Sequence, residues 1–360
     1  MTNLDIAYQR LHNQLITQRT FEKPGDVVQW LGAVQAQDYA AAKWAVGLRL
    51  QGVTSDDIEQ AFAAGAILRT HLMRPTWHFV SPADIRWLLA LTAPRVYAAS
   101  AYWYRRLELD DATCRCSNAV LANALQGGKQ LTRPELVSVL QQAGIATDDL
   151  QRFTYLMMRA ELDGIVCSGA RRGKQFTYAL LDERAPQART LDHDEALAEL
   201  SRRYFTSHGP AALKDYIWWS GLTAADASSG LEMVKSKLIH EAVDGQTYWF
   251  STATPPAKDL SSTVYLLPNF DEYIVGYTDR SAVFDASHTK KLDPRGNILF
   301  NYTIVMDGRV VGTWKRTLKK DAVIITPSLF TPLNTAETRA FAVSANRYGA
   351  FLESSVNTTF

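Results

Sequence analysis

The chain has 360 residues, of which 47% are apolar and 21% are charged, and its formal net charge is +1. These values describe a globular protein that is long enough for two or three domains, with no apolar run near the roughly 20 residues of a membrane span. Its three cysteines are too few for a disulfide framework or a zinc site, and its first residues do not form a signal peptide. We therefore expect a cytoplasmic protein, in which a near-neutral total charge can still include a basic face.

The first predicted unit, residues 1–116, is an expected winged helix with a linker at its end. Apolar spacing predicts helices over residues 5–14, 25–34, 39–50 and 55–64, followed by a strand pair within residues 67–80. Asp56 and Asp57 lie in the first turn of the fourth helix, where negative charge stabilises the positive end of the helix dipole. The turn between the second and third helices is the predicted helix-turn-helix turn.

The second predicted unit, residues 117–191, has the clearest winged-helix pattern. A short helix over residues 118–125 precedes Thr132-Arg133-Pro134-Glu135, which combines an N-cap, a first-turn proline and a capping-box glutamate. That helix is predicted to reach residue 142, and a third helix covers residues 148–162. Strands over residues 165–168 and 176–180 then enclose a basic loop. Three helices followed by a hairpin with a basic tip indicate a winged helix.

The remaining two units complete a predicted α+β fold of tandem winged-helix, or helix-turn-helix, units with a C-terminal strand-rich unit. The third unit, residues 192–255, repeats the order of three helices and a hairpin, which suggests a tandem array. The fourth unit, residues 256–360, is rich in strands and ends in a helix over residues 335–352. Within it, Asp307-Gly308 between apolar segments is a strong signal for a type I′ hairpin turn.

The stretch Gln35-Ala36-Gln37-Asp38 lies in the predicted turn of the first unit and contains two amides spaced i, i+2. Such residues point the same way only where the backbone is extended, and Asp38 suits the N-cap of the helix that begins at residue 39. The plain interpretation is that both glutamines are polar residues at a helix end. However, they lie where apolar residues are expected, between buried helices, so we interpret Gln35 and Gln37 as a pair that could hold one water.

Basic and polar residues follow in the predicted strand pair and in two loops. Alternation would place Arg74, Thr76 and His78 on one face of a strand, with Arg69 nearby, as DNA-binding or site-supporting groups; the alternative is that they are ordinary solvated or hydrogen-bonded strand residues. In the loops, either a phosphate contact or a simply solvated basic segment fits the sequence. The candidate residues in the loops are Arg171, Arg172 and Lys174 at the tip of the second unit, and Lys290 and Lys291 within the basic segment 287–297.

Two further groups favour structural roles on sequence alone. Asp271 and Glu272 could form the acid/base pair of a glycosidase, but a buried structural turn is the preferred interpretation. Residues 208–210 and the aromatic segment 215–222 resemble the packing core of the third unit. The sequence contains no nucleotide-binding, HExxH or GxSxG motif, so we expect no cofactor and no metal.

Taken together, several motifs resemble those of the winged-helix DNA glycosylases of the AlkZ/YcaQ type, bacterial enzymes that excise alkylated bases and unhook interstrand crosslinks. The resemblance extends over nearly the whole chain and implies tandem winged helices in a C shape around DNA, with a QxQ or QxD catalytic motif. Gln35 and Gln37 occupy the two motif positions. The matching segments are residues 35–38, 72–78, 218–222, 270–273 and 307–314.

The resemblance leads to a functional hypothesis with two alternatives. It implies a monomeric, monofunctional glycosylase acting on double-stranded DNA that carries alkylated purines or crosslinks, with Gln35 and Gln37 as catalytic residues and Asp38 as a structural cap. The first alternative is a non-catalytic winged-helix DNA-binding protein such as a transcription regulator. The second is a protein-interaction module, which would show no salt-dependent DNA affinity.

Overall fold

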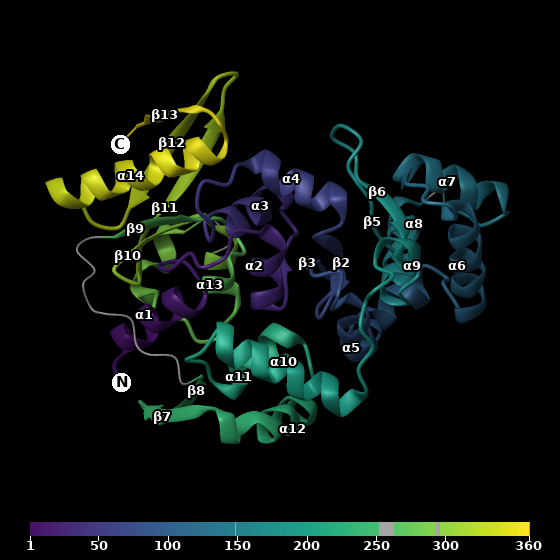
Figure 1. Cartoon of the computed structure of the whole chain (residues 1–360), viewed down its shortest axis with the longest axis horizontal. Coiled ribbons are helices and arrows are strands. Elements are labelled where there is room, and N and C mark those ends of the chain that lie inside the picture. Colours follow the sequence, from purple (N-terminus) through teal and green to yellow (C-terminus); the bar gives the residue numbers. More distant parts are fainter. Residues whose placement is uncertain (148, 252–262, 293–295, 360) are drawn as a thin grey trace.

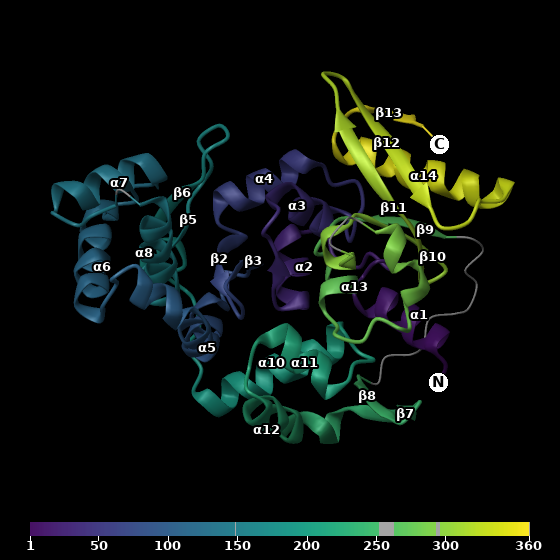
Figure 2. The ribbon, with the colours of Figure 1, turned by 180° about the vertical axis from the view of Figure 1, so that it is seen from behind.

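The computed structural model describes residues 1–147, 149–251, 263–292 and 296–359. Helices and small antiparallel sheets are both present, as predicted for an α+β fold. The helices of the second predicted unit lie at one end of the molecule and the C-terminal sheet at the other, with the first predicted unit between them (Figure 1). Three helices lie along one side: α10 (His193–Ser207), α11 (Leu213–Ser220) and α12 (Ala224–Val234). The same curved arrangement is seen from behind (Figure 2). In the described part of the chain, no helix combines the length and apolarity needed to cross a membrane.

The N-terminal region forms the four predicted helices and the predicted strand pair, with two differences. The second helix ends three residues early, because Gly32 adopts a positive φ of 81° after it. A 22-residue helix, α5, which the sequence analysis did not predict, follows the strand pair and contains Pro94; the proline costs the helix one hydrogen bond that tertiary packing offsets. The elements are α1 (Asn3–Asn13), α2 (Pro24–Leu31), β1 (Val34–Gln35), α3 (Tyr39–Gly47), α4 (Ser55–Ala64), β2 (Leu68–Leu72), β3 (Thr76–Val80) and α5 (Ile85–Arg106).

The next region has the predicted order of three helices and a hairpin. The predicted capping box is confirmed, since the Glu135 carboxylate accepts a hydrogen bond from the Thr132 amide at 2.6 Å. The first helix begins at Asp111, seven residues before the predicted start, and the predicted start of the third at Asp148 lies outside the described residues. The elements are α6 (Asp111–Leu125), β4 (Leu131–Thr132), α7 (Arg133–Gln142), α8 (Leu150–Leu162), β5 (Val166–Ser168), β6 (Thr177–Leu180) and α9 (Leu181–Arg184).

Three helices and a hairpin follow again, and then a five-stranded sheet of order β13-β12-β11-β10-β9. Asp307 and Gly308 have φ angles of 48° and 79°, the positive pair that a type I′ turn requires, and they join β10 to β11 as predicted. The elements are α10 (His193–Ser207), α11 (Leu213–Ser220), α12 (Ala224–Val234), η1 (Lys235–Lys237), β7 (Ile239–Val243), β8 (Gln246–Phe250), β9 (Val264–Leu267), α13 (Glu272–Val275), η2 (Ala286–Lys291), η3 (Ile298–Phe300), β10 (Thr303–Met306), β11 (Arg309–Leu318), β12 (Ala322–Leu329), α14 (Thr335–Phe351) and β13 (Ser355–Thr358).

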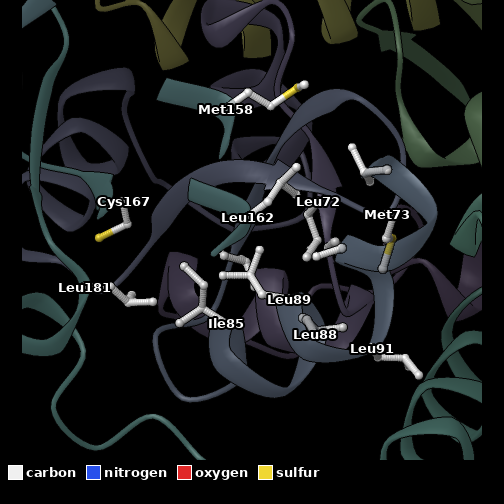
Figure 3. Packing of buried hydrophobic residues seen from close by; sticks show 14 of the residues in the cluster. Leu72, Met73, Ile85, Leu88, Leu89, Leu91, Met158, Leu162, Cys167 and Leu181 are labelled. Atoms are coloured by element: carbon white, nitrogen blue, oxygen red, sulfur yellow. The ribbon is translucent and has the colours of Figure 1, made fainter. Parts of the chain in front are cut away.

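Two hydrophobic cores meet within the N-terminal region. One core joins α5 and part of β2–β3 to α6–α8 and α10–α12, and Figure 3 shows side chains of this core from α5, α8 and the β2–β3 turn packed together. The other core joins α1–α4 to the C-terminal sheet and α14. Because β3 contributes Val80 to the first core and Phe79 to the second, this strand lies at the junction of the two.

A buried ion pair anchors the C-terminal region to the N-terminal helices. Arg49 donates two hydrogen bonds of 2.9 Å, one from each terminal nitrogen, to the two carboxylate oxygens of Asp271. Both side chains are completely buried. The guanidinium also donates to the main-chain carbonyls of Gln14 and Ala45 and to the side-chain oxygen of Gln14, so all five of its donors are satisfied.

Removing one partner of this pair should therefore destabilise the protein strongly. We expect Arg49→Met to lower the free energy of unfolding by about 3–5 kcal/mol, because it leaves the Asp271 carboxylate buried and unpaired. The matched control is Arg86→Gln, which breaks the exposed ion pair with Asp182 and should cost at most about 1 kcal/mol. Thermal and urea unfolding of the two variants measure the difference; equal losses would contradict this account of the buried pair.

Candidate active site

The glutamine pair lies on an extended segment at the edge of a three-stranded sheet of order β1-β3-β2. Gln35 is paired with His78 across β1 and β3, and beyond it the Ala36 amide donates to the Trp77 carbonyl at 2.7 Å. The predicted extended backbone is therefore present. Residues two apart on such a segment share a face, and directly paired residues lie side by side. Gln35, Gln37 and His78 consequently belong to one face of the sheet.

Gln35 is fixed at both its backbone and its side chain. Its amide N–H donates to Glu272 Oε1 at 3.0 Å, and its side-chain Oε1 accepts a hydrogen bond of 2.9 Å from Arg74 Nη2. The residue is 7% exposed. Arg74 lies in the turn between β2 and β3 and not on the strand, so its predicted place on a strand face was wrong. The turn nevertheless brings its guanidinium to the glutamine.

The Glu272 carboxylate behind Gln35 is completely enclosed. Oε2 accepts a hydrogen bond of 2.8 Å from Trp219 Nε1 and lies 3.3 Å from His208 Nε2, while Oε1 accepts from Gln35. Burial alone would raise the pKa of Glu272, but hydrogen bonds from His208, Gln35 and Trp219 outweigh it and hold the pKa below its usual value. Glu272 is therefore a buried anion that holds the backbone of the glutamine segment.

Gln37 and Asp38 are closer to solvent than Gln35. Gln37 is exposed, and its Oε1 is 3.4 Å from the Trp77 amide nitrogen, which is a weak contact. Asp38 is the N-cap of α3 and accepts a hydrogen bond of 3.1 Å from the Ala41 amide. The Asp38 carboxylate also accepts a hydrogen bond of 3.3 Å from the Tyr302 hydroxyl. Gln37 is thus the more accessible amide of the pair.

Arg69 lies on the opposite face of the sheet from Gln35 and has internal partners. Its Nε donates to the carbonyl of Ala36, between the two glutamines, at 3.0 Å. The guanidinium is sandwiched between the rings of Trp77 and Phe176, with distances to the ring centroids of 4.4 and 4.6 Å. Burial lowers the pKa of Arg69 to about 10, which leaves it charged at neutral pH. The structure places Arg69 as a support of the glutamine segment, away from solvent.

The other predicted basic residues are spread over separate surfaces. Arg171 is packed between the rings of Tyr39 and Phe176 and bonds to Glu59, and Arg172 is paired with Glu135 within its own region. Lys174 is exposed at the tip of the hairpin. Lys290 and Lys291 lie in η2, a short helix where the sequence suggested a loop, and Lys291 donates to the Phe330 carbonyl. Residues 293–295 of the predicted basic segment lie outside the described residues.

His78 is neutral and buried beside the glutamine pair. Its Nδ1 is 3.0 Å from the carbonyl of Thr76, so this nitrogen carries the hydrogen and Nε2 is the acceptor. Burial and, second, the nearby Arg74 charge lower the pKa of His78 to about 3. Thr76 Oγ1 is buried without a hydrogen-bond partner in the described part of the chain. No group of three or more potential metal ligands occurs among the described residues.

The end of α11 approaches the turn between β2 and β3 through a glycine. Gly221 has a φ of 69°, and a Cβ atom at this position would lie 2.3 Å from the Met73 carbonyl oxygen. Only glycine allows so close a contact. The preceding carbonyls of Trp218 and Trp219 can therefore reach Arg74, which donates to each at 3.1 Å.

Sequence reasoning missed three residues that support the site. Glu272 was interpreted as part of a structural turn and Trp219 as a core packing residue, and His208 was given no functional role. Each of these assignments describes burial correctly, since all three side chains are buried. The sequence does contain a signal for them, which is a carboxylate and a histidine within segments that are otherwise apolar. Buried charged groups need partners, so such residues indicate a buried contact.

Comparisons with known proteins find similarity to DNA glycosylases over most of the chain. The family model described as "DNA glycosylase AlkZ-like" matches residues 28–351. A protein from Streptomyces sahachiroi named "Interstrand DNA cross-link repair glycosylase" is 25% identical over 332 residues, which is 88% of each chain. The solved structure of the DNA glycosylase AlkZ from Streptomyces sahachiroi is similar in fold, with a TM-score of 0.77 at 21% identity over 99% of each chain.

The buried neutral His78 should make stability depend on pH. Its folded pKa lies below the unfolded value of about 6.5, so the unfolded chain takes up a proton first as the pH falls. The contribution of His78 to the free energy of unfolding is complete above about pH 7 and falls by about 2 kcal/mol between pH 7.5 and 5. We expect His78→Gln to show a smaller loss of thermal midpoint over this range than the unchanged protein. The exposed His193→Gln is the control; identical slopes for all three proteins would contradict the buried neutral state.

Proposed function

We propose that this chain, which belongs to the AlkZ-like DNA glycosylase family, is a monofunctional glycosylase for alkylated, cationic purines in double-stranded DNA. The family match covers most of the chain and sets the reaction class, which is hydrolysis of the N-glycosidic bond. The observation that carries the finer proposal is the exposed Gln37 next to the fixed Gln35. Neither side chain is part of the two hydrophobic cores. We expect a monomer that acts on DNA in the cytoplasm.

Amide chemistry restricts the substrates that such a pair can process. A glutamine side chain does not titrate near neutral pH, so it cannot remove a proton from water as a general base. It can accept a hydrogen bond through its carbonyl and donate through its amide nitrogen. Such a site positions water and stabilises charge, which is sufficient where the leaving group already departs easily. A purine alkylated at N7 or N3 carries a positive charge that its departure neutralises, so it meets this requirement.

The carboxylates adjoining the pair support this restriction. Glu272 is 1% exposed and already occupied by Gln35, Trp219 and His208, and Asp38 caps α3. Both carboxylates are engaged in these structural contacts, and the proposal gives neither a general-base role. In the proposed mechanism the two amides hold the water that attacks C1′ of the deoxyribose.

Interstrand crosslinks are the second proposed substrate class. The Streptomyces sahachiroi relative is named for crosslink repair, and the similarity to it extends over 88% of this chain. A crosslinked nucleotide is tethered to the opposite strand and cannot rotate fully into a closed pocket, unlike the flipped base of most base-modifying enzymes. The exposure of Gln37 supports an open site that could accept such a substrate.

A base-excision assay tests the proposal. We expect the unchanged protein to release the modified base from duplexes containing N7-methylguanine, and to separate the strands of a duplex crosslinked through N7 of guanine. Gln37→Ala should reduce the single-turnover rate by about 10²-fold or more, in the range seen when one preorganised hydrogen-bonding group is removed. The control is Gln51→Ala, an exposed glutamine of the same region, which should keep full activity.

Two outcomes would overturn the assignment. One is full activity of a folded Gln37→Ala protein, which would remove the glutamine from the mechanism. The other is tight, sequence-specific binding to undamaged DNA with no base release from any lesion, as the transcription-regulator alternative requires. The family assignment already favours the glycosylase over that alternative.

A further inference from the structure

The orientation of the Gln35 side-chain amide follows from the chemistry of its neighbour. A guanidinium group has only donors, so the glutamine atom that lies 2.9 Å from Arg74 Nη2 must be the carbonyl oxygen. The side-chain nitrogen of Gln35 is then turned away from Arg74. The second lone pair of the carbonyl oxygen lies beside a positive charge, which weakens it as an acceptor for water.

Arg74 is itself held in place by a different part of the fold. Its Nη1 donates to the carbonyl oxygens of Trp218 and Trp219 at 3.1 Å each, and the guanidinium lies over the Trp218 ring at 5.5 Å from the centroid. Both carbonyls are at the end of α11, where Gly221 permits the close approach to Met73. Arg74 therefore cannot follow the glutamine if the amide rotates, and rotation would bring two donors together.

The backbone of Gln35 is restrained independently. Its N–H is bound by the buried Glu272 carboxylate, and its paired position on β3 is set by the sheet register. With its backbone N–H and its side-chain oxygen both engaged, Gln35 keeps its side-chain nitrogen as the side-chain donor that can bind a ligand.

We propose that Arg74 is a positioning residue that makes Gln35 a hydrogen-bond donor only, and that the acceptor role toward the attacking water belongs to Gln37. This rests on the glycosylase function proposed above. The Gln35 Nε2–H group donates to the water oxygen, and a proton of the water points to Gln37 Oε1. As the bond from oxygen to C1′ forms, the bond to the purine nitrogen breaks with its electron pair, which neutralises the cationic base. The proton released from the attacking water passes to solvent on the exposed side of Gln37.

The two glutamines should respond in opposite ways to the same substitution. Gln37→Glu keeps an acceptor and should retain a single-turnover rate within about tenfold of the unchanged protein. Gln35→Glu loses the donor and directs its carboxylate to Arg74, so its rate should fall by about 10²-fold or more. Each substitution adds one negative charge, and the two substituted positions are close together. Single-turnover rates measured at a saturating protein concentration do not depend on differences in DNA affinity. Equal losses, or a larger loss in Gln37→Glu, would overturn the division of roles.

A double-mutant cycle tests the part of Arg74. We expect Arg74→Met to slow base excision by about tenfold or more in the unchanged background, but to cost little further in a Gln35→Ala background, because groups acting as one unit are not additive. Arg74→Lys should not restore the rate, since an ammonium group cannot span the glutamine and both tryptophan carbonyls. If the two losses multiplied, or if DNA affinity fell with an unchanged rate, Arg74 would be a DNA contact and the positioning role would be wrong.

The outcomes separate this inference from the proposed function. Absence of base release by the unchanged protein would overturn the glycosylase substrate proposal itself. Release by the unchanged protein together with equal effects of the two glutamate substitutions would leave the glycosylase in place and overturn only the assignment of donor and acceptor. Thermal midpoints of all variants show that each rate was measured on folded protein.

Discussion

The buried carboxylate of Glu272 is the interaction on which the arrangement of the site depends. Its partners come from separate parts of the chain: the Gln35 amide on β1, the Trp219 indole on α11, and His208 at the end of α10. A carboxylate removed from water is costly unless it is fully hydrogen-bonded. The Glu272 carboxylate is thus satisfied only when these elements are together, and its contact with the Gln35 amide also fixes the backbone of the glutamine pair.

Negative charge is in this way kept behind the glutamines and away from the proposed DNA side. Asp271 is paired with Arg49 in the interior, Glu272 is enclosed by donors, and Asp38 is engaged at the start of α3. A site that faces a polyanion benefits from this arrangement, since carboxylates near phosphates repel them. The amides provide polarity without charge, which is consistent with a reaction in which the departing base already carries the positive charge.

The glutamine segment is also supported from the opposite face of its sheet. Arg69 binds the carbonyl of Ala36 while its guanidinium is stacked between Trp77 and Phe176, and the latter belongs to the hairpin region of the neighbouring unit. The sequence suggested that Arg69 binds DNA or supports the site, and these internal contacts are of the supporting kind. Stacking and hydrogen bonding together connect the hairpin rigidly to the segment that contains the two glutamines.

The sequence by itself determined the local features: the helices around the glutamine turn, its extended backbone, the Asp38 position before α3, the hairpin at Asp307-Gly308, and the family to which the motifs belong. These follow from periodicity and capping, which act over a few residues. Only the tertiary structure decided that Glu272 meets Gln35 across 237 positions and that Arg74, in a turn and not on a strand, orients the amide. The physical reason is that such contacts arise from the packing of whole elements around the two cores, and α5, which the sequence analysis did not predict, is part of that packing.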